Sequence, residues 1–309
     1  MHMNFDELLK KVYSCETKTL SVACAHDKPV LEAVKAAKEK NIANAILVGD
    51  ADKIAEIAKE IGMNLSDFEI IDEKDNAEAA LKAVTLVHEG KADMYMKGLM
   101  DTKSFLKSLL NKEVGLRRPD GKTLSHVSVF EIPGYDRLFF LTDVAFLPYP
   151  TLQDKVQIIE HTVNVCKACG IDNPKVAPIA AVEVVNEKMP TTVEAAELTK
   201  MCEEGLIKDC IVDGPLSMDI AIDPEAAAHK GATDRKIQGD ADILLFPDIH
   251  AGNLVYKTLV HTVPGIKNGC ILTGTTAPAI LTSRSDTMDV KLNSIALAAV
   301  VAEAMKKNQ

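Results

Sequence analysis

Residues that could carry out chemistry cluster near the C-terminus of the chain. Residues 273–278 read Thr-Gly-Thr-Thr-Ala-Pro after the apolar run 270–272, and Ser283-Arg284-Ser285-Asp286 follows shortly after. Open α/β sheets bind ligands where a strand ends in a glycine-containing loop, and the planar fork of arginine grips two phosphate oxygens at once. The segment therefore predicts a phosphate-binding loop, with a helix cap and a surface ion pair as the structural alternative.

Three further loops share this plan, in which an apolar run ends in small or acidic residues. They are Lys97-Gly98 with Asp101-Thr102, Asp213-Gly214-Pro215, and residues 246–253 with Asp248, Gly252 and Asn253. Each loop places backbone N–H groups and polar side chains at the carboxyl end of a strand, which suits phosphate oxygens. A single such loop is weak evidence, because a glycine at a helix start usually only solves a turn. Together the loops predict a ligand with several phosphate or carbonyl oxygens.

Length and composition set the class of protein. The 309 residues suffice for two domains, each with its own core, and 47% apolar and 26% charged residues are typical of a globular protein. With 4% aromatic residues and no tryptophan, the chain lacks the stacking platforms of single-stranded nucleic-acid binders. A formal charge of −10 disfavours DNA and anionic lipid. We expect neither a nucleic-acid nor a membrane partner.

The cysteines and the N-terminal residues indicate a cytoplasmic protein. Seven cysteines, an odd number, are spread among apolar segments and do not resemble a disulfide framework, which favours a reducing compartment. Residues 4–12 are charged and amphipathic rather than a secretory signal. No apolar run approaches the ~18 residues that a membrane span requires.

Strand-like runs alternate with amphipathic helical windows along most of the chain, which predicts an α/β fold with mainly parallel sheets flanked by helices. We expect strands at 20–25, 45–48, 68–71, 94–96, 127–132, 138–142, 176–182, 210–212, 243–246 and 270–272. We expect helices at 29–40, 51–61, 77–89, 152–168, 192–204 and 290–305. Because a short Pro-Gly turn joins 127–132 to 138–142, these two runs predict an antiparallel hairpin.

The organisation into domains follows from two features. Pro148 and Pro150 favour a stiff, extended crossing between domains. The last helix is apolar on more than one face, so we expect it to pack against the first domain. The prediction is a first α/β domain of residues 1–145 plus 271–309, an inserted second α/β domain of residues 146–270, and an active site in the cleft between them.

Several common catalytic signatures are absent from the sequence. It contains no Gly-x-Gly-x-x-Gly after a strand, no Walker loop, no His-Glu-x-x-His and no Gly-x-Ser-x-Gly. Cys166 and Cys169 have a redox spacing, but their position late in a helical pattern favours a buried helix face. Asp248 and His250 alone do not make a metal site, so no metal is expected.

The chain resembles the phosphate acyltransferases, which move acyl groups between coenzyme A and phosphate. Residues 241–257, Ala-Asp-Ile-Leu-Leu-Phe-Pro-Asp-Ile-His-Ala-Gly-Asn-Leu-Val-Tyr-Lys, closely resemble a stretch characteristic of that family. Residues 213–219 and 142–151 resemble two more of its blocks, and Ser283-Arg284 falls where the family carries its active-site pair. The likeness runs from about residue 90 to about residue 305. It implies an architecture like that of isocitrate and isopropylmalate dehydrogenases.

Within the family the chain looks more like the butyryl branch than the acetyl branch. The acetyl branch follows Ser-Arg with Gly-Cys, whereas this chain has Ser285-Asp286. The Lys97-Gly98 loop and residues 273–278 and 291–297 also resemble the butyryl branch. The catalytic aspartate of the acetyl branch falls on Val290 here, which leaves Asp286 or Asp289 as the base.

The resemblance implies the reaction butyryl-CoA plus phosphate giving butyryl phosphate plus CoA, with coenzyme A as a substrate and no cofactor. A free thiol has a pKa of roughly 8.5, so a carboxylate such as Asp286 would help to deprotonate CoA. The alternative role for Asp286 is a cap for the following helix. Arg284 would bind the phosphoryl group, and Ser283 would donate to the carbonyl oxygen.

Other residues are expected to bind substrate. Phosphate or CoA would contact the loop and helix that carry Asp248, Gly252, Asn253 and Lys257, although Lys257 could equally be a solvated helix residue. On the first domain the candidates are Lys97 and Thr102, with Thr273 and Thr275 in the loop before Ser283. Arg117-Arg118 could bind CoA phosphates or form a surface basic pair.

Alternative functions stay open at this point. One is a phosphate acetyltransferase or a broad short-chain or branched acyltransferase, because one methylene is worth only ~1–3 kcal/mol in an apolar pocket. Others are a dehydrogenase of similar fold and a CoA-binding protein without catalysis. The resemblance also implies a homo-oligomer, at least a dimer.

Overall fold

The computed structural model describes residues 3–121, 123–283 and 286–307 and divides the chain into two compact units. The discontinuous unit comprises Phe5–Lys122 and Lys267–Gln309, and the inserted unit comprises Thr123–Ile266 with Met1–Asn4. The sequence placed the first crossing after residue 145. The inserted unit begins earlier, at Thr123, because the hairpin of residues 125–142 pairs with strand β9 of that unit.

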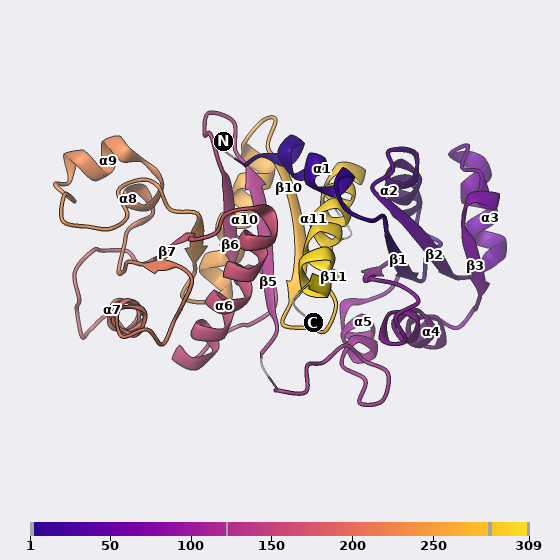
Figure 1. Cartoon of the computed structure of the whole chain (residues 1–309), viewed down its shortest axis with the longest axis horizontal. Coiled ribbons are helices and arrows are strands. Elements are labelled where there is room, and N and C mark those ends of the chain that lie inside the picture. Colours follow the sequence, from indigo (N-terminus) through magenta and orange to yellow (C-terminus); the bar gives the residue numbers. More distant parts are fainter. Residues whose placement is uncertain (1–2, 122, 284–285, 308–309) are drawn as a thin grey trace. The chain divides into compact units, whose positions relative to one another are not determined.

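The discontinuous unit has a mainly parallel sheet (Figure 1). Its strands lie in the order β3-β2-β1-β4-β11-β10, with bounds β1 Lys18–Ala23, β2 Ala43–Gly49, β3 Glu69–Asp72, β4 Met94–Lys97, β10 Lys267–Thr273 and β11 Ala279–Ile280. The first five strands of that order are parallel, and β10 runs antiparallel to β11. The loops that follow the parallel strands therefore share one edge of the sheet.

Helices flank this sheet, and several begin at an aspartate. They are α1 Phe5–Tyr13, α2 Lys28–Glu39, α3 Ala51–Glu60, α4 Asn76–His88, α5 Thr102–Leu109 and α11 Met288–Lys307, with a 3₁₀ turn at Leu65–Asp67. Asp50, Asp75 and Asp101 accept backbone N–H groups of the first turns of α3, α4 and α5. Helix α11 contacts β10, β1 and α2, as its apolar sequence predicted (Figure 1).

The inserted unit is also α/β. Its strands lie in the order β5-β6-β9-β7-β8, with bounds β5 Ser125–Glu131, β6 Leu138–Thr142, β7 Lys175–Pro178, β8 Ile211–Val212 and β9 Ile243–Leu245. Strands β5 and β6 form the expected antiparallel hairpin, and the other pairs are parallel. The helices are α6 Leu152–Cys169, α7 Pro190–Glu203, α8 Met218–Ile222, α9 Pro224–His229 and α10 Ile249–Thr262.

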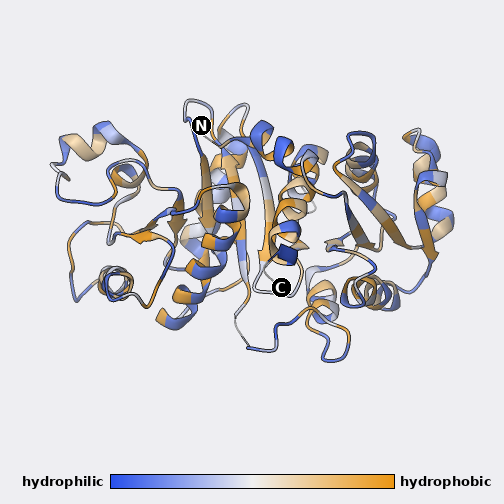
Figure 2. Cartoon of the chain, viewed as in Figure 1, coloured by the Kyte–Doolittle hydropathy of each residue, from blue (hydrophilic) through white to orange (hydrophobic). Residues whose placement is uncertain are grey.

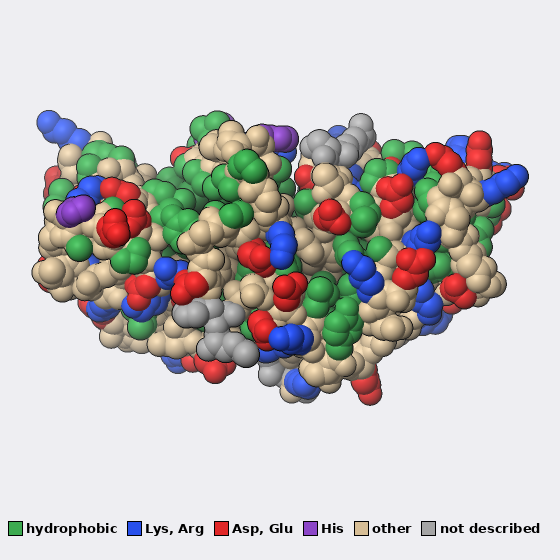
Figure 3. All heavy atoms as spheres, turned by 90° about the horizontal axis from the view of Figure 1, so that it is seen from above, with side chains coloured by type: hydrophobic (Ala, Val, Ile, Leu, Met, Phe, Trp, Pro, Cys, Tyr) green, Lys and Arg blue, Asp and Glu red, His purple; other side chains and the backbone are tan. Residues whose placement is uncertain are grey.

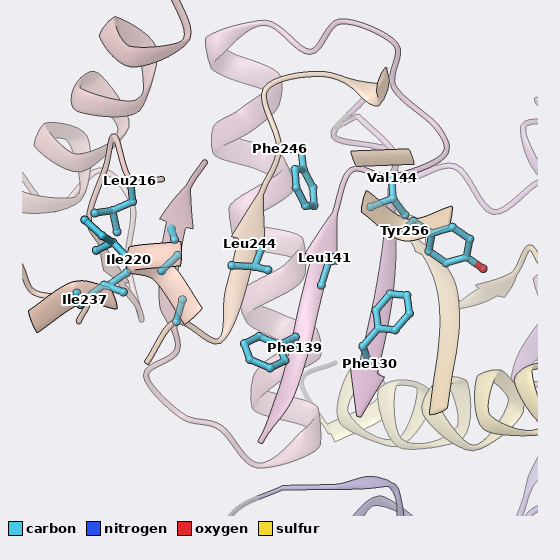
Figure 4. Packing of buried hydrophobic residues seen from close by; sticks show 14 of the residues in the cluster. Phe130, Phe139, Leu141, Val144, Leu216, Ile220, Ile237, Leu244, Phe246 and Tyr256 are labelled. Carbon is cyan, nitrogen blue, oxygen red and sulfur yellow. The ribbon is translucent and has the colours of Figure 1, made fainter. Parts of the chain in front are cut away.

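Apolar side chains from β5, β6, β9 and α10 form the core of the inserted unit. Phe130, Phe139 and Leu141 project from the hairpin, and Phe246 and Tyr256 pack with them (Figure 4). Figure 2 shows hydrophobic residues along most of the strands and also in helices such as α11. Burial of such side chains supplies roughly 1.5–3 kcal/mol each.

The surface carries charges of both signs. In the face seen in Figure 3, lysine and arginine side chains are interspersed with aspartate and glutamate rather than gathered into one basic area. Of the helices in the described part of the chain, none is both long and apolar enough to cross a membrane.

Candidate active site

Ser283 and Asp286 close a turn just after β11. The backbone N–H of Asp286 donates to the Ser283 carbonyl oxygen at 3.2 Å, and the backbone N–H of Ser283 donates to Oδ2 of Asp286 at 2.7 Å. Ser283 is exposed, whereas Asp286 is only 8% exposed. A buried carboxylate that accepts a backbone N–H holds such a turn firmly. We call the segment that these two hydrogen bonds close between Ser283 and Asp286 the catalytic turn, after the role that the sequence predicts for it; Arg284 and Ser285 lie outside the described residues.

Lys291 of α11 reaches back to the catalytic turn. Its Nζ donates to the carbonyl oxygens of Asp286 at 2.8 Å and of Ser283 at 3.3 Å, and the residue is 2% exposed. Burial lowers the pKa of the Lys291 ammonium, while Asp286 and Asp27 act in the opposite direction. The sequence analysis did not identify Lys291 as a candidate site residue. Its position among the apolar residues of the last helix was the available indication that it is buried.

Thr287 caps α11. Its Oγ1 accepts the backbone N–H of Val290 at 3.4 Å, and the helix begins at Met288. The Asp286 carboxylate accepts the backbone N–H of Ser283, on the other side of the turn from α11. Asp289 is exposed in the first turn of α11.

Lys97 lies at the same edge of the sheet as the catalytic turn. It ends β4, which is the parallel neighbour of β11, with Met96 opposite Ile280. Neighbouring strands are about 4.8 Å apart, so the two loops emerge side by side. Lys97 is buried, whereas Thr102 is exposed at the start of α5.

Gly98 holds the loop after Lys97 against the end of β1. Its N–H donates to the Ala23 carbonyl oxygen at 2.8 Å, and a Cβ at this position would lie 2.2 Å from the Cys24 carbonyl oxygen. Only glycine allows such a close approach of two backbones.

Thr273 and Thr275 lie at the opposite edge. Because β10 is antiparallel to β11, the loop between them is at the edge where β4 begins. Thr275 is buried and its Oγ1 donates to the Ala277 carbonyl oxygen at 2.6 Å. The sequence treated these threonines and Ser283 as one ligand-binding loop, but the short strand β11 separates them.

Arg117 and Arg118 lie near that opposite edge as well. Arg117 forms an isolated backbone bridge with Thr275, and Arg118 Nε lies 3.1 Å from Asp120 Oδ2. This arrangement matches a surface basic pair more closely than a CoA site beside Ser283.

In the inserted unit, three predicted binding residues position α10. Asp248 caps the helix by accepting the N–H groups of His250 and Ala251 at 2.9 and 3.0 Å. Asn253 Nδ2 donates to the Val144 carbonyl oxygen at 2.9 Å, and a Cβ at Gly252 would lie 2.4 Å from the Asp143 carbonyl oxygen. The contacts of Asn253 and Gly252 hold α10 close against the loop after β6.

Asp143 organises that loop. Its carboxylate accepts N–H groups of Ala145 at 2.8 Å, Phe146 at 2.7 Å and His126 at 2.9 Å, and the residue is 2% exposed. Lys257, further along α10, places its Nζ 5.3 Å from the centre of the Tyr256 ring. The blocks 142–151 and 241–257 thus meet through backbone and side-chain contacts.

The cysteines and histidines that the structure describes form no alternative centre. Cys166 and Cys169 are fully buried in α6, and burial raises the pKa of Cys166 well above the ordinary value. A buried thiol of this kind is a poor nucleophile. Among the residues that the structure describes, no group of three or more His, Cys, Asp and Glu side chains could hold a metal ion.

Comparison with known proteins places these loops in a family. The family model described as phosphate acetyl/butaryl transferase matches residues 4–80 and 73–299. The chain belongs to this family. It is 58% identical over 302 residues to the phosphate butyryltransferase of Clostridium acetobutylicum, covering 98% of this chain and 99% of that protein. It is 57% identical over 306 residues to the phosphate butyryltransferase of Clostridium beijerinckii, covering 99% of this chain and all of that protein.

A solved structure has the same fold as this chain. The branched-chain phosphotransacylase from Enterococcus faecalis V583 matches with a TM-score of 0.81 and 34% identity, covering 93% of this chain and 99% of that chain. The chain is therefore a transferase enzyme of the phosphate acetyl/butyryl transferase family, and the matched region includes the catalytic turn, Lys97 and α10. Family membership sets the dehydrogenase alternative aside.

Proposed function

We propose that the protein transfers a butyryl group reversibly between coenzyme A and inorganic phosphate. The observation that carries this proposal is the catalytic turn. Ser283 is exposed there, while the Asp286 carboxylate and the Lys291 ammonium stabilise the turn through hydrogen bonds to its backbone. The two clostridial relatives, identical at more than half of their positions, are named for the same reaction.

In the direction of acyl-CoA formation, the thiol sulfur of CoA attacks the carbonyl carbon of butyryl phosphate. The new C–S bond forms as the thiol loses its proton, and the C–O bond then breaks to release phosphate. At neutral pH only a few per cent of a free thiol is thiolate, so a carboxylate beside it raises the reactive fraction. We assign this role to Asp286, with the exposed Asp289 as the alternative.

Charge builds on the carbonyl oxygen during attack and on the phosphate as it leaves. The Ser283 hydroxyl is suited to donate to the carbonyl oxygen, and a well-placed donor of this kind is worth about 3 kcal/mol in the transition state. Arg284 of the same turn, and Lys97 on the neighbouring strand, would bind phosphate oxygens. No cofactor enters this scheme.

The remaining predicted contacts are assigned by position. Thr102 and Lys257 are candidates for direct contact with CoA or phosphate. Asp248, Gly252 and Asn253 would act by placing α10, because their polar groups or small size serve packing in this structure. Thr273 and Thr275 would support β11 from the other edge. We also infer that the enzyme assembles at least as a dimer.

A second candidate is a broader transferase of short or branched acyl groups. The name of the Enterococcus faecalis relative, a branched-chain phosphotransacylase, favours it. One methylene changes binding by only ~1–3 kcal/mol, so a few side chains could shift the preference.

The test is CoA release from butyryl-CoA, followed with a thiol reagent, with and without phosphate. Acetyl-CoA and isobutyryl-CoA run alongside. Release that depends on phosphate and is fastest with butyryl-CoA supports the first proposal, and equal or faster release from isobutyryl-CoA supports the second. Release that ignores phosphate would contradict both.

A further inference from the structure

Cys202 and Cys210 form a thiol pair at one edge of the inserted unit's sheet. Cys202 lies in the last turn of α7, and Cys210 directly precedes β8, the outermost strand of the order β5-β6-β9-β7-β8. The Cys202 thiol donates to the Cys210 carbonyl oxygen at 3.5 Å, so its side chain points at the residue that carries the other thiol. A disulfide can form only between cysteines that lie close together with their side chains facing each other. The proposed acyl transfer uses neither residue.

The loop between the two cysteines is short and is held by its own backbone. The N–H of Gly205 donates to the Cys202 carbonyl oxygen at 3.0 Å, and the N–H of Leu206 donates to the Met201 carbonyl oxygen at 2.9 Å. Gly205 has a φ of +76°, and this pair of bonds around a left-handed glycine is the Schellman ending of a helix. The chain therefore returns Cys210 to the end of α7 without the help of a disulfide.

Both cysteines of the pair are partly open to solvent. Cys202 and Cys210 are each half-buried, whereas Cys166 and Cys169 of α6 are completely buried. All seven cysteines lie in the described part of the chain as thiols. Because modification of a thiol depends on access as well as on its ionisation, a small reagent can reach the first pair in the folded protein and not the second.

The two thiols interact with each other, and this interaction keeps the proton on Cys210. Burial, together with the charge and the hydrogen bonding of Cys202, raises the pKa of the Cys210 thiol to about 12. Cys210 is therefore protonated at neutral pH and can donate its S–H to the Cys202 sulfur once Cys202 has ionised. Since the thiolate is the form that attacks a disulfide, Cys202 is the nucleophile of the pair and Cys210 is the second thiol.

We propose that Cys202 and Cys210 are a reversible disulfide site that reacts with low-molecular-weight disulfides. The Cys202 thiolate attacks one sulfur of the reagent, whose other half leaves as a thiolate and takes up a proton, and a mixed disulfide forms on Cys202. Cys210 then loses its proton to water and attacks the Cys202 sulfur, and the second half of the reagent leaves in the same way. One reagent disulfide is reduced to two thiols while the two protein thiols are oxidised to one disulfide.

The second thiol gives the site its function. A reducing compartment keeps the pair as thiols, so the disulfide forms only when the supply of oxidant rises. A partly exposed thiol without a neighbour keeps its modifier or is oxidised further to acids that reductants do not restore. Cys210 ends the reaction of Cys202 at a disulfide, which is the step that cellular thiols reverse.

The test incubates the reduced, full-length protein in a glutathione buffer with the reduced form in excess, which disfavours mixed disulfides on single cysteines. Acid quenching, alkylation with N-ethylmaleimide and peptide mapping by mass spectrometry follow. The wild type should lose two of its seven thiols, yield a peptide link between Cys202 and Cys210, and regain both thiols with dithiothreitol. Cys15→Ser is the matched control, because it removes a half-buried cysteine of the discontinuous unit, and it should form the same link.

Two single variants test the order of the steps with oxidised glutathione alone. Cys210→Ser should retain one glutathione on Cys202, because no second thiol displaces it. Cys202→Ser should leave Cys210 unmodified at the same reagent concentration, because Cys210 keeps its proton. Circular dichroism of each variant shows whether it is folded.

Three results would overturn the proposal. They are retention of all seven thiols in the wild type, a link from Cys210 to Cys166, whose charge also interacts with it, and equal modification of Cys210 with and without Cys202. If a serine variant does not fold, the link mapped in the wild type and in Cys15→Ser decides.

Discussion

Replacing Lys291 with methionine tests whether this buried lysine positions the catalytic turn. Methionine has a similar length but cannot donate to the two carbonyl oxygens that Lys291 contacts, at 2.8 Å in Asp286 and 3.3 Å in Ser283. A hydrogen bond to a charged group contributes about 1.5–3 kcal/mol, and the longer of the two should contribute least. Burying the Lys291 ammonium also costs several kcal/mol of desolvation, and methionine avoids this cost. Because the lost hydrogen bonds and the avoided desolvation offset each other, the free energy of unfolding of Lys291→Met should stay within about 1.5 kcal/mol of the wild type.

The effect on catalysis should be larger than the effect on stability. A displacement of about 1 Å in a catalytic group can cost roughly 100-fold in rate. We therefore expect Lys291→Met to lower kcat by roughly 10- to 100-fold, with KM for butyryl-CoA changed by less than about threefold because only the reacting end of the substrate is affected. Phosphate-dependent CoA release gives both constants, and urea unfolding gives the free energy of unfolding.

Lys307→Met is the matched control, because Lys307 belongs to the same helix but its side chain is 69% exposed. It should match the wild type in both assays. Lys291→Arg should recover part of kcat, since guanidinium donors can reach the same carbonyl oxygens. Full activity in Lys291→Met, or a loss of activity explained by a loss of folded protein, would refute the positioning role.

Three further outcomes can be checked. Asp286→Asn should lower kcat roughly 100-fold while calorimetry shows unchanged CoA affinity, and a similar loss of affinity would contradict a catalytic role. Gly252→Ala should lower the free energy of unfolding in urea by about 1–3 kcal/mol, because its Cβ would lie 2.4 Å from the Asp143 carbonyl oxygen; an unchanged midpoint would show that α10 can shift. A hydrogen bond from Ser217 lowers the pKa of Asp219 from 3.8 to about 2, so the stability that its carboxylate adds is complete above pH 3.8 and lost toward pH 2. Asp219→Asn should be less stable than the wild type at neutral pH by less than about 1 kcal/mol, and this difference should shrink over that acidic range, whereas a constant difference would exclude the charge as its cause.

The regular elements could be predicted because long alternating runs carry a strong periodic signal. Every strand expected from the sequence is present within a few residues of its expected bounds, and the hairpin of β5 and β6 is antiparallel as its turn predicted. The two-residue strand β11 could not be foreseen, since Ala279 and Ile280 are too few to show any period. That omission is why Thr273 and Thr275 were grouped with Ser283.

The candidate site could be predicted in part. Ser283, Asp286 and Lys97 come to one edge because they follow adjacent parallel strands, which is a consequence of topology that alternation already implies. Lys291 escaped prediction because its burial depends on carbonyl oxygens that only the folded turn brings to it.

The block 241–257 shows another limit of sequence reasoning. It is the most characteristic stretch of the chain, yet Asp248 and Asn253 form hydrogen bonds with the protein's own backbone. A residue type that suits phosphate binding also suits capping and loop anchoring, and the sequence alone does not separate these uses.

Strand β11 has only two residues, and its pairing with β4 sets the position of the catalytic turn relative to Lys97. The strand is held at its start by the bond from Tyr95 N–H to the Pro278 carbonyl oxygen at 3.1 Å and, through the preceding loop, by the bond from Thr276 N–H to the Leu116 carbonyl oxygen at 2.8 Å. A slip of one residue would move Ser283 along the sheet by about 3.3 Å and would turn alternate side chains to the other face. Insertions or deletions between β10 and β11 would therefore change the candidate active site, although the loop itself lies at the far edge of the sheet.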